Sequence, residues 1–196
     1  MARRYELKRR AERQEQTRRR IVEAAIQLHQ TKGPARTTLS DIARLAGVQR
    51  HTLYRHFPDE REVGLACSGL FHELNPPPDP AGWHAIPDRG ERLRSGLSAL
   101  YGWYEQVEDM FVCVLRDAEV HPLTRELVEL RAAEPMSRIR RSLARGLGRG
   151  KRIQAALDLA IDFRAWRRLR ESGLAAAEAA DLMAEAVLCA DHRRQP

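Results

Sequence analysis

The stretch from Thr37 to Phe57 constrains the fold of this 196-residue chain more than any other segment. Ala43 is small enough to let a second helix approach, and Gly47 suits a sharp turn with a positive φ angle. Leu53 is placed to fill the crevice between the two helices. This spacing predicts a helix-turn-helix whose second helix lies at the surface. The alternative is a pair of ordinary packed helices joined by a glycine turn.

The second helix of this unit presents polar side chains on its outer face. These are Arg50, His51, Thr52, Arg55 and His56. Each can hydrogen-bond to phosphate groups or base edges, so the face predicts contact with double-stranded DNA. At the start of the unit, Thr38 and Asp41 resemble a capping box that begins the first helix.

The charge of the chain is concentrated in the same region. Residues 1–64 carry 15 Lys plus Arg and 8 Asp plus Glu, which accounts for the whole net charge of +7, whereas residues 65–196 are balanced. Nucleic acid is the first candidate for a polyanionic partner, and an anionic membrane surface is the second. The early arginines are candidates for an arm in the DNA minor groove or for a disordered tail: Arg3, Arg4, Arg9, Arg10 and Arg13.

The pattern of the whole chain is helical. Aromatic residues make up only 6%, and no segment alternates β-branched residues. We expect an all-α fold with helices at about residues 10–32, 39–46, 50–57, 60–74, 88–107, 109–119, 122–146, 151–171 and 175–192. The prolines between Asn75 and Gly82 predict a linker, because proline cannot continue a helix. From the charge distribution we divide the chain into a DNA-binding domain, residues 1–64, and a regulatory and dimerisation domain, residues 65–196.

The residues around the turn resemble a known family closely. Ile42–Val48 and Thr52–Asp59 are similar to the N-terminal DNA-binding domain of the TetR family of transcriptional regulators, and the resemblance covers about residues 15–66. It implies a homodimer, a palindromic operator and a body pocket whose small-molecule ligand releases DNA. It also implies phosphate contacts by Thr38, Tyr54 and His56, and contacts to bases and phosphates by Arg50, His51 and Thr52.

Three positions depart from the family pattern. Gln49 stands where many members have a serine that caps the recognition helix, so we expect its amide to meet DNA instead. His51 replaces a glycine and brings an imidazole into the groove. Glu60 replaces a lysine that contacts phosphate, and a carboxylate there would be repelled, which leaves Arg61 as the alternative contact.

The last two expected helices are apolar on more than one side. A helix of that kind must bury both sides, one in its own core and one in a partner or in a wider core. We assign one stripe to a four-helix dimer interface, with Ile153, Leu157, Ile161, Met183 and Val187.

Aromatic and other large apolar residues gather in the middle of the chain. They predict a cavity for an apolar or cationic ligand, although an ordinary core explains any one of them equally well. The candidate pocket residues are Phe71, Trp83, Trp103, Tyr104, Met110, Phe111, Val114 and Leu115.

Other classes of protein lack support in the sequence. We find no GxSxG, HExxH, P-loop or dinucleotide-binding motif, so we expect no catalytic residues, no cofactor and no metal site. No apolar run is long enough to span a membrane or to serve as a signal peptide, and three scattered cysteines fit a reducing cytoplasm. We therefore expect a cytoplasmic, dimeric, ligand-responsive repressor. An activator and a helix-turn-helix protein-interaction module remain the alternatives.

Overall fold

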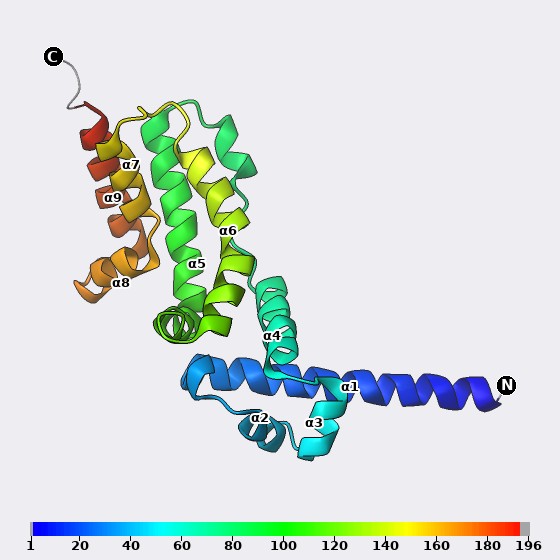
Figure 1. Ribbon diagram of the computed structural model, residues 1–196. Coiled ribbons are helices and arrows are strands. Elements are labelled where there is room, and N and C mark those ends of the chain that lie inside the picture. Colours follow the sequence, from blue (N-terminus) through cyan, green and yellow to red (C-terminus); the bar gives the residue numbers. More distant parts are fainter. Residues whose placement is uncertain (1, 193–196) are drawn as a thin grey trace. The chain divides into compact units, whose positions relative to one another are not determined.

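The computed structural model describes the backbone of residues 2–192 and the side chains of residues 5, 6 and 8–191. Within residues 2–192 the chain forms α-helices and two 3-10 helices (η1 and η2) but no strand, which confirms the expected all-α class (Figure 1). The elements are α1 (Ala2–Thr31), η1 (Pro34–Arg36), α2 (Leu39–Leu45), α3 (Arg50–His56), α4 (Glu60–Leu74), η2 (Pro80–Ala85), α5 (Arg89–Asp117), α6 (Pro122–Leu143), α7 (Lys151–Ala160), α8 (Phe163–Glu171) and α9 (Ala176–His192). Among the described residues, no helix has the length and apolar character that crossing a bilayer requires.

Several helix boundaries differ from the sequence prediction, since α1 begins at Ala2 instead of near Arg10 and α6 ends at Leu143 instead of near Gly146. The expected break near Glu108 is absent, and α5 continues to Asp117, because this position holds neither proline nor glycine. The expected helix over residues 151–171 is divided instead at Ile161–Asp162. There the Asp162 side chain accepts a hydrogen bond from the backbone N–H of Ala165 and caps a new helix, α8.

The chain divides into two compact units. One contains Met1–Asn75 with Glu108–Arg131, and the other contains Pro76–Val107 with Ala132–Pro196. The proline-rich linker follows the first long segment, as expected, but a division after Gly64 does not match the units. Helix α4 runs through Gly64 without interruption and buries Val63 and Cys67 on either side of it.

In the first unit α1 lies against α2, α3 and α4 (Figure 1). Its side chains Ile21, Val22 and Ala25 are buried and form the centre of the core. Ala43 and Leu53 close that core from α2 and α3. At the α2–α3 turn Gly47 has a φ of 64°, and the backbone N–H of Val48 donates to the carbonyl of Ala43. The predicted helix-turn-helix is therefore present, with Leu53 fully buried.

In the second unit an aromatic cluster lies where α7 ends. Tyr101 Oη donates a hydrogen bond to the carbonyl of Ala160 at 2.7 Å, and Tyr104 Oη donates to the carbonyl of Ile161 at 2.6 Å. Both hydroxyls satisfy carbonyls that a helix end leaves without partners. Trp166 and Phe163 of α8 pack against the Tyr104 ring. The α7–α8 break is thus fixed by residues of α5, more than 50 positions earlier in the chain.

The stripe assigned to a subunit interface lies mostly inside the single chain. Ile153 and Leu157 of α7, and Met183 and Val187 of α9, are all buried, where α7 and α9 pack together. Ile161 is half-buried at the α7–α8 break. Because a buried side chain has almost no surface left for a second subunit, the outward sides of these helices are the ones free to meet a partner.

The buried leucine of α3 gives a direct test of the fold. We expect Leu53→Ala to lower the free energy of unfolding by about 3 kcal/mol, because it leaves a cavity at a fully buried site. Leu45→Ala removes the same group from α2, where the side chain is 43% exposed, and should change stability by less than about 0.5 kcal/mol. Urea unfolding followed by circular dichroism measures both. Equal effects would contradict the role given to Leu53.

Candidate nucleic-acid interface

The start of α2 is held by a closed set of hydrogen bonds. Thr38 Oγ1 accepts from the backbone N–H of Asp41 at 3.1 Å, and the Asp41 carboxylate accepts from the backbone N–H of Thr38 at 3.2 Å. The predicted capping box is confirmed. Hydrogen bonds from Lys32, Thr38 and Arg44 hold the pKa of Asp41 well below its usual range. The Thr38 hydroxyl also donates to Asp41 at 2.9 Å, so a phosphate would have to compete with that carboxylate for its hydrogen.

The outer face of α3 carries the side chains predicted to meet DNA. Gln49 is the N-cap residue but makes no side-chain capping hydrogen bond, so its amide is not used to start the helix. Arg50, His51, Tyr54 and Arg55 are exposed. Leu53 on the opposite side is buried, which fixes the rotation of α3 and aims these four side chains outward.

Two contacts along α3 order its polar side chains. The Arg50 guanidinium lies 5.5 Å from the centre of the Tyr54 ring and donates a hydrogen bond to the Tyr54 hydroxyl at 3.2 Å. Thr52 Oγ1 lies 3.3 Å from His51 Nε2. These neighbours restrict long side chains before any ligand arrives, which lowers the entropy lost on binding.

His56 differs from the other predicted contacts. Its side chain is half-buried, and Nε2 is enclosed without a hydrogen-bond partner among the described residues. Burial lowers the pKa of the imidazole, and the positive charges of Arg55 and Arg18 lower it further. The enclosed Nε2 atom is thus not placed to meet a phosphate.

The first two residues of α4, Glu60 and Arg61, face other residues of the first unit. Arg61 donates to the Glu126 carboxylate at 2.6 Å, and the Glu60 carboxylate lies 3.7 Å from His121 Nε2. The side chains of Arg61 and Glu60 are about half exposed, so both contacts form at the surface of the unit. Arg61 is thus engaged by a carboxylate of α6, which disfavours it as the replacement phosphate contact.

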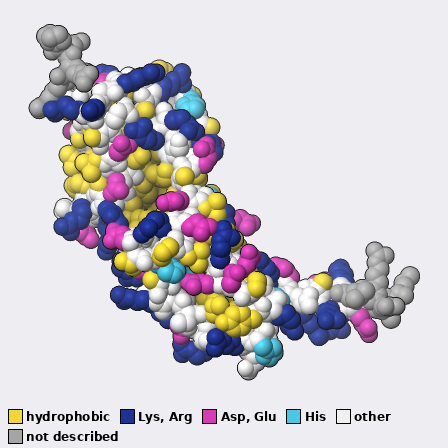
Figure 2. Space-filling model, viewed as in Figure 1, with side chains coloured by type: hydrophobic (Ala, Val, Ile, Leu, Met, Phe, Trp, Pro, Cys, Tyr) yellow, Lys and Arg dark blue, Asp and Glu magenta, His cyan; other side chains and the backbone are white. Residues whose placement is uncertain are grey.

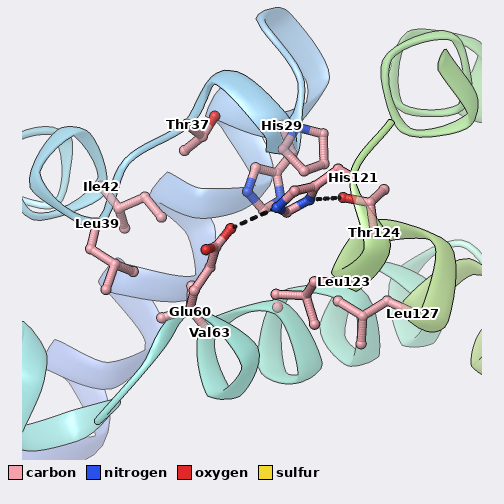
Figure 3. Close-up of a pocket in the computed structure, with 12 residues that line it drawn as sticks. His29, Thr37, Leu39, Ile42, Glu60, Val63, His121, Leu123, Thr124 and Leu127 are labelled. Atoms are coloured by element: carbon pink, nitrogen blue, oxygen red, sulfur yellow. Dashed lines mark hydrogen bonds and ion pairs between the residues drawn. The ribbon is translucent and has the colours of Figure 1, made fainter. Parts of the chain in front are cut away.

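A small cavity lies beside this contact, within the first unit (Figure 3). His121 reaches from the turn before α6 toward Glu60 of α4 on one side and Thr124 on the other, and its Nδ1 is 2.7 Å from Thr124 Oγ1. His29 of α1 also lines it. The space open to a water-sized sphere is about 20 Å³, which suits a single water molecule rather than an effector.

The candidate pocket residues do not line this cavity, and they are divided between the two units. Trp83, Trp103 and Tyr104 belong to the second unit, where all three are buried. The first unit holds the other five, of which only Met110 is buried and the rest are half-buried: Phe71, Met110, Phe111, Val114 and Leu115.

Residues 21–67 match the family described as bacterial regulatory proteins, tetR family. This segment, which contains α2 and α3, is therefore similar to the DNA-binding domain of TetR-family regulators. Two curated relatives from Pseudomonas putida are similar to it, the HTH-type transcriptional regulator TtgR and the probable HTH-type transcriptional regulator ArpR. Each is 43% identical over 69 residues, which is 35% of this chain, and the chain spans only 33% of each relative.

Solved TetR structures share the fold over most of the chain. The regulator PfmR from Thermus thermophilus superposes with a TM-score of 0.61 at 23% identity, covering 86% of this chain and 97% of PfmR. A TetR-like regulator from a Rhodococcus species gives a TM-score of 0.58 at 18% identity, covering 88% and 93%. Sequence similarity is thus concentrated in the helix-turn-helix, while the rest of the chain keeps the fold alone.

Sequence reasoning missed two residues that shape this interface. Arg18 of α1 places its guanidinium 4.5 Å from the centre of the Phe57 ring, at the end of α3. Lys32 donates to Asp41 at 2.7 Å and helps to close the α2 cap. A signal for Arg18 exists, because it precedes the buried residues Val22 and Ala25 by four and seven positions and so continues their stripe.

The histidine beside the small cavity predicts a pH effect on stability. Burial lowers the pKa of His29 to about 4, against the raising influence of Asp117. Because the unfolded side chain titrates near 6.5, the unfolded state alone binds the proton between about pH 6.5 and 4. Stability that is complete above pH 6.5 is therefore lost as the pH falls to 4. We expect the loss from this group to be about 3 kcal/mol at pH 4.

Urea unfolding from pH 7 to pH 4, compared with His29→Gln, measures this loss. The variant should lose less stability over the same range. NMR titration of the His29 ring in the unchanged protein provides a second measurement, independent of whether the variant folds. A ring that titrates near pH 6.5 would contradict the prediction.

Proposed function

We propose that this protein is a regulator of the TetR family, dimeric and sequence-specific in its binding to DNA. One observation carries the proposal: a seven-residue helix, α3, is fixed by a buried leucine and turns Arg50, His51, Tyr54 and Arg55 to the surface. The surplus of positive charge in residues 1–64 supports the choice of DNA as partner. A regulator of this kind acts where the DNA is, so we place it in the cytoplasm.

Within the interface we divide the residues by the chemistry they can perform. Arg50 and His51 near the start of α3 are proposed to read base edges in the major groove, where arginine bonds well to guanine. Tyr54 and Arg55 are proposed to hold phosphates on either side. Thr38, Gln49, Thr52 and His56 complete the set, with Gln49 available because it does not cap α3.

The dimer is proposed to form through the outward sides of α7 and α9. Leu159 of α7 and Leu182 of α9 are large apolar side chains that remain exposed in the single chain, at 56% and 46%. Ala186 and Cys189 continue the Leu182 side of α9 at helical spacing and are also exposed. Figure 2 shows hydrophobic side chains at the surface in this region of the second unit. A two-fold dimer would explain recognition of a palindrome.

We propose that a small molecule releases the protein from its operator, with the predicted pocket residues of the second unit, Trp83, Trp103 and Tyr104, as the candidate site. Trp103 and Tyr104 support this assignment, because they belong to a buried aromatic cluster of the kind that apolar or cationic ligands use. A ligand that favours one spacing of the two recognition helices would change the affinity for a palindrome. Activation instead of repression depends on where the operator lies, and no residue of the chain determines it.

Binding to selected DNA tests the function. We expect the protein to enrich a palindromic sequence from random duplexes, and Arg50→Ala to weaken binding to that sequence about tenfold or more while reducing its preference over scrambled DNA. Arg168→Ala, at an exposed position of α8, is the matched control and should bind as the unchanged protein does. Fluorescence anisotropy at fixed salt measures all three. Capture of a protein partner with no DNA binding would favour the interaction-module alternative.

Self-association tests the proposed interface. We expect Leu159→Glu and Leu182→Glu each to convert the dimer to monomer at micromolar concentration, because a carboxylate would be buried in an apolar contact. Val120→Glu, at a side chain 78% exposed in the first unit, should leave the dimer intact. Sedimentation velocity distinguishes the two species. Dimers that survive both changes would place the interface elsewhere.

A further inference from the structure

In the amino-terminal half of α1, no described side chain is buried against the rest of the unit. The first buried residue is Ile21, and every described side chain from Tyr5 to Gln16 is exposed. We call residues 2–16 the α1 extension. It continues α1 past α2, α3 and α4 (Figure 1), over a length of about 22 Å at 1.5 Å per residue. Because its described side chains contribute nothing to the core, the extension is available for an external partner.

The extension is strongly basic. Residues 2–16 contain six Arg or Lys and three Glu. Lys8 makes a long ion pair of 3.9 Å with Glu12, and the Arg9 guanidinium lies 5.8 Å from the centre of the Tyr5 ring. Among the described side chains, Arg10 and Arg13 form no ion pair. Figure 2 shows the basic side chains along this part of α1. Of the four basic side chains described here, Lys8 alone forms an ion pair, and that pair is long.

The carboxyl end of the α1 extension lies near the end of the recognition helix, α3. The Arg18 guanidinium stacks on Phe57, the residue directly after α3. Residues 8–13 lie about 8–15 Å further along the helix axis, beyond the end of α3. With α3 in a major groove, that distance reaches the phosphates that border the next minor groove, which is about 6 Å wide. The extension therefore leads toward the DNA backbone just outside the segment that α3 reads.

We propose that the α1 extension is a second DNA contact, which binds phosphates of the duplex flanking each half-site. This inference rests on the proposed DNA-binding function and deepens it. Guanidinium groups bind phosphate oxygens in pairs, and contacts of this kind add affinity without reading sequence. Duplex DNA suits the extension better than a membrane surface, because interfacial helices need a broad apolar face and this segment has only Tyr5 and Leu7 as large apolar residues.

Helix geometry indicates which basic residues contact DNA. The direction of Arg18 marks the side of α1 that faces α3, and therefore the side on which DNA lies. At 100° per residue, Lys8 and Arg10 lie about 80° to either side of that direction, and their long side chains can reach toward it. Arg9 and Arg13 lie about 180° and 140° away from it. If DNA binds one defined side of the helix, Lys8 and Arg10 contribute more to binding than Arg9 and Arg13. A general attraction between charges would make all four contribute equally.

Two double variants of the full chain test the assignment, and each removes two positive charges. K8Q/R10Q changes the side facing α3, and R9Q/R13Q changes the opposite side, while glutamine keeps a good helix propensity. Affinity is measured by anisotropy across a salt series. The probes are a selected operator with 12 flanking base pairs on each side, the same operator without flanks, and a scrambled duplex. Circular dichroism checks that both variants keep the helix content of the unchanged protein.

We expect K8Q/R10Q to weaken binding to the flanked operator about tenfold and to reduce the slope of log K against log salt by about two per protomer. Its preference for operator over scrambled DNA should be unchanged, and its defect should shrink on the operator without flanks. R9Q/R13Q should bind within about twofold of the unchanged protein. Equal effects of the two variants, or no effect of either, would overturn the proposal.

Two controls separate this proposal from its alternatives. If the unchanged protein shows no selective DNA binding, the proposed function fails; if it binds selectively and K8Q/R10Q binds equally well, only the role of the extension fails. Co-sedimentation with vesicles containing 30% phosphatidylserine tests the membrane alternative. Loss of vesicle binding in K8Q/R10Q with unchanged DNA binding would overturn the proposal in favour of a membrane contact.

Discussion

The burial of Leu53 is the interaction on which the recognition surface depends. Helix α3 has seven residues, which is too short to be stable alone, and Leu53 is its only buried side chain. That side chain enters the core formed by Ile21, Ala25 and Ala43, and the positive φ of Gly47 lets α3 turn toward this core. With one side of the helix fixed in this way, the polar residues of the other side stay out of the core, and the contacts of Arg50 with Tyr54 and of Thr52 with His51 run along α3 itself.

Contacts at the other end of the first unit explain why its charge is not spread evenly. The start of α4 pairs Arg61 with Glu126, and the Asp117 carboxylate accepts hydrogen bonds from the backbone of Ala35 and from Arg116. These contacts neutralise charge within the fold. The positive groups that keep their exposure are mainly those of α1 and α3, so the surplus that the sequence assigns to one third of the chain is further restricted to two helices.

The parts of the fold that follow from neighbouring residues were predictable from sequence. The capping box at Thr38, the turn at Gly47 and the plug at Leu53 each depend on residues a few positions apart. The α7–α8 break was not predictable, because the tyrosines that bond to the end of α7 belong to α5. Periodicity also identified two apolar sides on the last helices without distinguishing them. Only the packing of α7 against α9 shows that Ile153 and Val187 face inward.

Glu60 illustrates why a family pattern cannot assign a role to a residue by itself. A carboxylate at this position is unfavourable near phosphate, and the sequence alone suggested that Arg61 would replace the missing lysine. In the fold, both side chains turn to the start of α6, toward His121 and Glu126. The distance of 3.7 Å from Glu60 to His121 is too long for a hydrogen bond, so the contact attracts only when the imidazole is protonated. The first turn of α4 is therefore engaged within the fold. Under the proposed function, a phosphate contact would come from another basic segment of the same unit, for which the α1 extension has the charge and the position.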